Sequence, residues 1–207
     1  MTATQWVTRR PYCHVALAQS MPLYKTAAAR DLAAAYHKLL RAEGGKLPPK
    51  GRLDVTELAR AVPHLLLCAL IRPDKCIYRV AGEEVKARIG RNPVGLNYYD
   101  LVPPERRANA MRAMNMVIDV PCAWRVEIEQ SYSSGISRLV EAAAFPLASA
   151  QADVDGFVVL ADCKIGPGAR GAEDGVTLLG TNVIRRDLVD IGFGVDEGFE
   201  DLVPAPD

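Results

Sequence analysis

Residues 122–130 read Cys-Ala-Trp-Arg-Val-Glu-Ile-Glu-Gln, and their regular alternation decides the fold class. The apolar side chains Trp124, Val126 and Ile128 fall on one side of an extended chain, and charged side chains fall on the other, which is the period of two of a β-strand. The turn Ser133-Ser134-Gly135 and the connection 151–156 separate this stretch from two more apolar segments, 136–147 and 157–165. The sequence therefore predicts three consecutive antiparallel strands.

A helix and a hairpin are predicted on the N-terminal side of these strands. Pro104 suits the first turn of a helix over 104–118, which ends before Pro121. Further upstream, the apolar run 65–71, turn residues 72–75 and the segment 76–80 predict a β-hairpin. Residues 83–89 predict a short helix between the hairpin and an irregular stretch at 96–102.

Residues 27–43 are rich in alanine and predict the first long helix. Thr26 is suited to cap its start, and Gly44-Gly45 ends it. Its apolar stripe of Leu32, Tyr36, Leu39 and Leu40 suits packing either on the domain's own sheet or on a second protomer.

Together these elements predict an α+β domain with a five-stranded antiparallel sheet and helices on one face. We divide the chain into a weakly ordered arm (1–25), an N-terminal helix with a linker helix (26–62), the core (63–166) and a C-terminal extension (167–207). The glycine-rich stretch 166–175 indicates a linker rather than a phosphate-binding loop, because no helix is evident after it.

Composition excludes several classes of function. The 207 residues hold 25 basic and 25 acidic side chains, so no basic excess favours nucleic acid. No apolar run approaches the ~20 residues of a membrane helix, and no signal peptide is visible. The five cysteines are scattered without C-x-x-C spacing, which is typical of a reduced protein, so we expect a cytoplasmic location without membrane contact.

Several short stretches, in order, resemble a known family. They are Val-Pro-His-Leu-Leu-Leu at 62–67, Tyr-Arg-Val-Ala-Gly at 78–82, Gly-Arg-Asn-Pro-Val-Gly at 90–95, and Arg-Leu-Val-Glu with Phe-Pro-Leu between 138 and 147. In this arrangement the chain resembles the PAS domain superfamily, and within it the alphaproteobacterial family of short stand-alone PAS-like proteins. The resemblance spans about residues 30–166, with Tyr36 where that family is expected to have Trp.

This resemblance implies a sensory or regulatory domain that is often dimeric through its first helix. We therefore expect a homodimer contact through Leu32, Tyr36, Leu39 and Leu40, and a regulatory partner protein that receives the signal by contact. The resemblance implies no particular ligand. The Asn-Cys-Arg-Phe-Leu-Gln type of sequence that marks flavin photoreceptors does not occur here.

Catalytic and cofactor motifs are sparse, so the sequence predicts a binding protein rather than an enzyme. It has three histidines and no H-E-x-x-H, G-x-S-x-G or P-loop motif, and we expect no metal. Haem is unsupported, because the helix 104–118 contains no histidine and its methionines are suited to fill a core. The identity of any cofactor stays open.

The resemblance places a cavity between one face of the sheet and the short helices. We expect it to be lined by Leu67, Tyr78, Val85, Ile89, Tyr98, Leu101, Met111, Met114, Trp124 and Phe145, with Arg79 and His64 as polar anchors. These mostly apolar walls suit a small organic ligand. The same residues also describe a filled core, which would make the protein a structural adaptor or dimerisation module, and an enzyme using the cavity is a further alternative.

Overall fold

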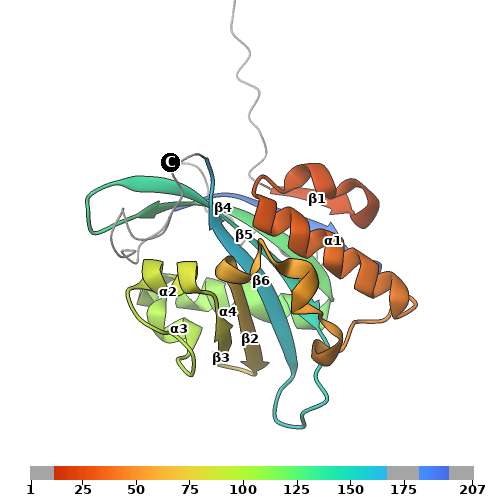
Figure 1. Ribbon diagram of the computed structural model, residues 1–207. Helices are drawn as coiled ribbons and strands as arrows, with labels where there is room; N and C mark the ends of the chain where they lie inside the picture. The colour runs from red at the N-terminus through yellow and green to blue at the C-terminus, as the bar shows by residue number, and fades with distance from the viewer. Residues whose placement is uncertain (1–11, 167–181, 196–207) are drawn as a thin grey trace, which may run out of the picture.

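A computed structural model describes residues 12–166 and 182–195 and shows one seven-stranded sheet (Figure 1). The strands run in the order β1-β7-β4-β5-β6-β2-β3. Their bounds are β1 Tyr12–Ala16, β2 Leu65–Ile71, β3 Lys75–Ala81, β4 Cys122–Ser131, β5 Ser137–Leu147, β6 Gly156–Lys164 and β7 Asn182–Asp190. The predicted α+β class is confirmed, and the five predicted strands form the antiparallel run β4-β5-β6-β2-β3. This order, with helices between β3 and β4, is the one expected from the sequence.

The sheet is wider than predicted, because two strands extend it beyond β4. β7 pairs antiparallel with β4, and β1 pairs parallel with β7. β1 comes from the predicted weakly ordered arm and β7 from the predicted C-terminal extension. Neither alternates cleanly in sequence, since adjacent arginines at 185 and 186 interrupt the apolar pattern of β7. Most of the predicted linker 166–175 lies outside the described residues.

Helix α1, Ala27–Ala42, covers one face of the sheet and packs on β5 and β6. The predicted cap is present, because Thr26 Oγ1 accepts a hydrogen bond from the amide of Ala29 at 3.2 Å. Tyr36 is fully buried on this face, and its hydroxyl donates to the Pro146 carbonyl at 2.8 Å. Short 3-10 turns lie at Leu17–Gln19, Met21–Leu23, Lys50–Arg52, Val55–Leu58 and Val62–His64.

Three further helices cover the opposite face. They are α2 Glu83–Ile89, α3 Tyr98–Leu101 and α4 Pro104–Asp119. α2 ends at Gly90, whose φ of 78° is the left-handed conformation that glycine adopts without strain. The helices of the core thus lie on one face, as predicted, and the separate N-terminal helix α1 lies on the other side of the sheet (Figure 1). No helix in the described ranges is long and apolar enough to cross a membrane.

Because helices cover both faces, the strands contribute to two separate cores. Leu66, Cys68 and Trp124 belong to the core beneath α2, α3 and α4, whereas Leu65, Ala69 and Phe145 belong to the core beneath α1. Successive side chains of a strand point to opposite faces, so residues next to each other in sequence enter different cores. This alternation determines which strand residues can reach a ligand site.

Candidate ligand-binding site

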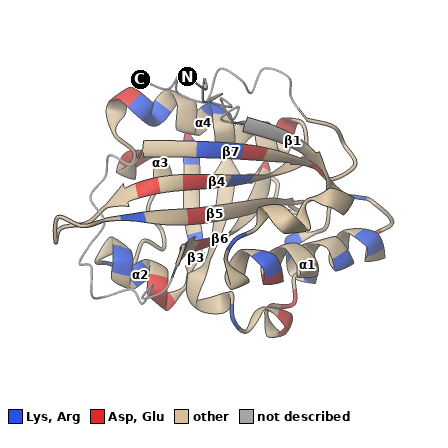
Figure 2. Ribbon diagram, turned by 90° about the horizontal axis from the view of Figure 1, so that it is seen from above, with Lys and Arg blue, Asp and Glu red and all other residues tan. Residues whose placement is uncertain are grey.

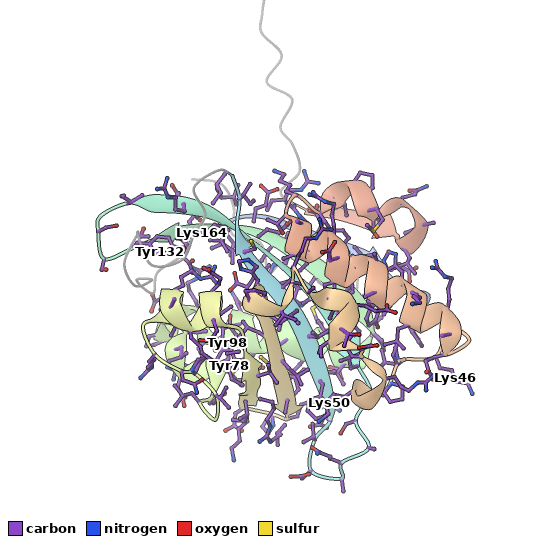
Figure 3. All side chains as sticks on the ribbon, viewed as in Figure 1. Lys46, Lys50, Tyr78, Tyr98, Tyr132 and Lys164 are labelled. Atoms are coloured by element: carbon purple, nitrogen blue, oxygen red, sulfur yellow. The ribbon has the colours of Figure 1, made fainter. Side chains whose placement is uncertain are left out.

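A cavity of about 460 Å³ lies in the core beneath α2, α3 and α4. Its floor is the sheet, and its walls come from α2, α3, α4 and the loops that join them. Tyr78 on β3 and Tyr98 on α3 meet edge to face, with ring centroids 6.2 Å apart, at the side where these elements adjoin (Figure 3). The wall residues from the sheet include Leu66, Cys68, Tyr78, Trp124, Val126, Ile128, Gln130, Ala142, Leu160, Asp162, Val183 and Arg186.

Among the residues that the structure describes, four arginines and one acidic residue line this cavity. Arg88 on α2 is 4% exposed and pairs with Asp162 on β6, with Nη2 and Oδ2 2.7 Å apart. Burial by itself would lower the pKa of Arg88, but the charge of Asp162 raises it above its ordinary value. This pair ties α2 to the sheet and occupies the acidic residue.

The other three arginines enter from different elements. Arg91 follows α2 and is exposed, Arg106 lies in the first turns of α4 and is half-buried, and Arg186 lies on β7. Burial lowers the pKa of Arg186 to about 10; Tyr98 opposes this shift and the positive charge of Arg106 adds to it. The Arg186 guanidinium also lies 6.0 Å from the ring centroid of Trp124.

Trp124 and Asp162 line the cavity and each has a buried polar atom without a hydrogen-bond partner among the described residues. These atoms are Trp124 Nε1, a donor, and Asp162 Oδ1, an acceptor. A buried polar atom without a partner costs roughly 1–3 kcal/mol.

The structure brings most of the predicted pocket residues together. Tyr78, Ile89, Tyr98, Leu101, Met114 and Trp124 line the cavity. Val85 is fully buried in the same core and Met111 packs beside it, but neither reaches the cavity. Leu67 and Phe145, which were also predicted to line the cavity, lie in the core beneath α1 instead, because strand alternation turns both side chains toward that helix.

Neither predicted polar anchor lines the cavity. Arg79 is exposed and sits at the β-bulge of β3, where Leu67 pairs with Val80 and Cys68 with Tyr78. His64 is half-buried at the start of β2. Burial lowers its pKa; Glu84 and Asp162 oppose this shift, and Arg88 adds to it. We did not predict the polar groups that do line the cavity. The sequence held one signal for them, because Arg88 follows the predicted pocket residue Val85 by three positions and therefore lies on the same side of α2.

The predicted dimer stripe is mostly used inside the protein. Leu32, Tyr36 and Leu40 are at most 3% exposed and pack on the sheet, with the Tyr36 ring 4.8 Å from that of Phe145; Leu39 is half-buried. The three buried side chains therefore offer no surface to a second protomer. The physical reason is that α1 covers a sheet face that would otherwise expose apolar residues.

A buried cluster of charges lies on the α1 side of the sheet, behind the cavity floor. Arg125 donates to Glu141 at 2.6 Å, to Asp187 at 2.9 Å and to Glu127. Lys25 reaches Glu127 at 2.6 Å, and Arg185 reaches Asp187 at 2.8 Å. We call these six residues the charge cluster: Lys25, Arg125, Glu127, Glu141, Arg185 and Asp187. Figure 2 shows its charged segments side by side on β4, β5 and β7.

The charge cluster also holds the start of α1. The Glu141 carboxylate accepts hydrogen bonds from the amides of Lys25 and Thr26, at 2.9 and 2.7 Å, and from the Thr26 hydroxyl at 2.7 Å. Three acidic and three basic side chains balance in charge: Arg125 and the three acids are buried, whereas Arg185 is half-buried and Lys25 is exposed. The described residues contain no group of histidine, cysteine and acidic side chains suited to hold a metal ion.

Solved structures with PAS and light-oxygen-voltage domains are similar to parts of the chain. A PAS-B domain of Cycle from Drosophila melanogaster is 12% identical, covering 48% of this chain and 99% of that one, with a TM-score of 0.36. A fungal light-oxygen-voltage photoreceptor domain is 20% identical, covering 68% and 95%, with a TM-score of 0.40. A PAS domain from Colwellia psychrerythraea is 13% identical, covering 54% and 96%, with a TM-score of 0.37.

No protein-family model matches the chain, and no curated protein matches its sequence. The function proposed below therefore rests on the residues of this chain.

Proposed function

We propose that the protein is a PAS-type sensory domain that binds a small molecule in the cavity and passes its state on by contact with a partner protein. The observation that carries this proposal is the 460 Å³ cavity itself. Protein interiors are close-packed, with few voids larger than a water molecule, whereas small-molecule sites typically enclose about 300–1,000 Å³. A structural adaptor with a filled core would have no use for this space.

The polar groups on the cavity wall support the same function. Trp124 and Asp162 both line the cavity, and Trp124 Nε1 and Asp162 Oδ1 are buried polar atoms without a protein partner in the described ranges. In a filled core such atoms cost stability, while in a binding site they are available to orient a ligand. The wall thus combines apolar surface with a few polar groups, as small-molecule sites do.

Strand β7 supports a route for the signal. Arg186 faces the cavity, and its neighbour Asp187 points to the other face, where it pairs with Arg125 of the charge cluster. A ligand that moves Arg186 would move Asp187 with it, because the two residues share one backbone. We propose that this movement alters the docking of α1, whose start is held by Glu141 of the same cluster.

A pair of substitutions on neighbouring residues of β5 tests whether the cavity is real. Ala142 lines the cavity, whereas Ala143 is fully buried on the α1 side. We expect Ala142→Phe to change the free energy of unfolding by less than about 1 kcal/mol, because the ring enters empty space. Ala143→Phe should cost about 3 kcal/mol, since it overpacks a filled core. Urea unfolding monitored by circular dichroism measures both.

Equal, large losses of stability for the two variants would show that the core is filled and would support the adaptor alternative. Native mass spectrometry of the freshly purified full chain adds a second readout. It reports a bound small molecule and tests the homodimer expected from the family resemblance in one spectrum. A monomer without bound mass would contradict the homodimer and would leave the cavity to be judged by the stability pair.

A further inference from the structure

We infer that the cavity takes a small aromatic or apolar molecule that carries an anionic group, and that Arg106 and Arg91 bind this group. The inference rests on the proposed function, because it requires a ligand-binding cavity. Its basis is the charge of the wall: among the lining residues that the structure describes, four are arginines and one is acidic. That acid, Asp162, is already paired with Arg88 at 2.7 Å.

Arg106 and Arg91 are the arginines available to a ligand. Their guanidinium groups form no hydrogen bond or ion pair with any residue in the described part of the chain, and both border the cavity. Arg106 is also close enough to Arg186 for the two positive charges to repel each other. An anion beside Arg106 would reduce this repulsion and gain charge-assisted hydrogen bonds from a planar guanidinium.

The remaining wall describes the rest of the ligand. The rings of Tyr78, Tyr98 and Trp124 present flat apolar surface to the cavity. A cationic ligand would meet like charges from three elements, so the wall selects against it.

Two fluorescent probes of nearly the same shape test the inference. 8-Anilinonaphthalene-1-sulfonate carries a sulfonate, and N-phenyl-1-naphthylamine has the same aromatic body without it. Titrated into the full chain, the sulfonate probe should bind at least about tenfold more tightly, since a hydrogen bond to a charged group is worth ~1.5–3 kcal/mol and each 1.4 kcal/mol is a factor of ten. Its affinity should also fall with salt, and that of the neutral probe should not.

Variants assign the effect to the arginines. Arg106→Gln should weaken the sulfonate probe about tenfold and leave the neutral probe unchanged. Arg91→Gln, at an exposed position, gives a second variant that cannot disturb the core, and it should act in the same direction. Arg60→Gln is the matched control, because Arg60 is an exposed arginine on the α1 side that pairs with Asp31. Ala142→Phe should weaken both probes, since it occupies the cavity.

The outcomes separate the two proposals. Equal affinity of the wild-type protein for both probes, or an unchanged preference in both arginine variants, would overturn the anionic ligand and leave the cavity intact. If neither probe binds, or if both bind Ala142→Phe as well as wild type, the proposed ligand-binding function fails first. Circular dichroism of each variant shows whether a lost affinity reflects lost folding.

Discussion

At the scale of single residues, Arg125 is the central side chain of the charge cluster. It is 1% exposed and donates hydrogen bonds to three carboxylates, of which Glu141 and Asp187 are fully buried. Burial by itself would raise the pKa of Glu127, but hydrogen bonds from Lys25 and Arg125 lower it below its ordinary value. Glu127 therefore stays ionised near neutral pH, and it depends on both cations for this.

Removing Arg125 should consequently be costly. Arg125→Met keeps much of the volume but leaves three carboxylates with only Lys25 and Arg185, and breaking a buried pair in this way costs about 3–5 kcal/mol. Urea unfolding at pH 7 measures the loss. Arg60→Met should leave stability nearly unchanged, because its ion pair with Asp31 is exposed. Similar effects of the two variants would show that the charge cluster is not held together as described.

At the scale of elements, Gly82 allows the chain after β3 to lie directly against the 62–64 turn that precedes β2. Its amide donates to the Leu65 carbonyl at 2.7 Å, and it caps the start of α2. A Cβ atom built there would lie 2.3 Å from the Pro63 carbonyl oxygen. This oxygen belongs to the backbone, so it cannot move aside by a change of side-chain rotamer. The close approach of two backbone segments, rather than an unusual φ, requires glycine here.

Gly82→Ala should therefore destabilise the protein by about 3 kcal/mol, the upper end for forcing extra volume into a packed site. Gly51→Ala is the control, because a Cβ there meets nothing within 4 Å and φ is not positive. The control should be neutral or slightly stabilising. Thermal unfolding of both variants measures the difference, and an unchanged melting temperature for Gly82→Ala would contradict the close approach of the Gly82 backbone to the 62–64 turn.

At the scale of the whole molecule, one sheet separates the cavity from the charge cluster and connects them through its strands. β4 and β7 each place one residue on the cavity side and the next on the cluster side, as in Trp124 with Arg125 and Arg186 with Asp187. The two strands are neighbours in the sheet. A ligand that displaces cavity residues on these strands would therefore also displace residues of the charge cluster, which holds the start of α1.

Hydrogen exchange tests this coupling. Binding of 8-anilinonaphthalene-1-sulfonate should change exchange in β7 and at the amides of Lys25 and Thr26, which donate to Glu141 on the far side of the sheet. The last turn of α1, around Arg41, lies away from the cluster and serves as the internal control. Changes confined to cavity-lining segments would contradict a route through the sheet and would leave ligand binding unaffected.

The sequence determined most elements, because their signals are local. The alternation at 122–130 predicts β4, the alanine-rich run after Thr26 predicts α1, and the apolar run before Pro73 predicts β2. The family resemblance, rather than a local pattern, pointed to six residues that line the cavity, among them Tyr78, Tyr98 and Trp124. These side chains are large and apolar, and they lie on elements whose period is visible in the sequence.

Only the tertiary structure decided which face each side chain serves. Both faces of the sheet are covered by helices, so an apolar residue such as Phe145 or Leu67 suits either core, and composition cannot distinguish them. Likewise, nothing local brings Arg106 of α4 beside Arg186 of β7, because their proximity depends on the added strand pairing with β4. The chemistry of the cavity depends on these long-range contacts, because only the packing of distant elements determines whether a charged side chain has a partner.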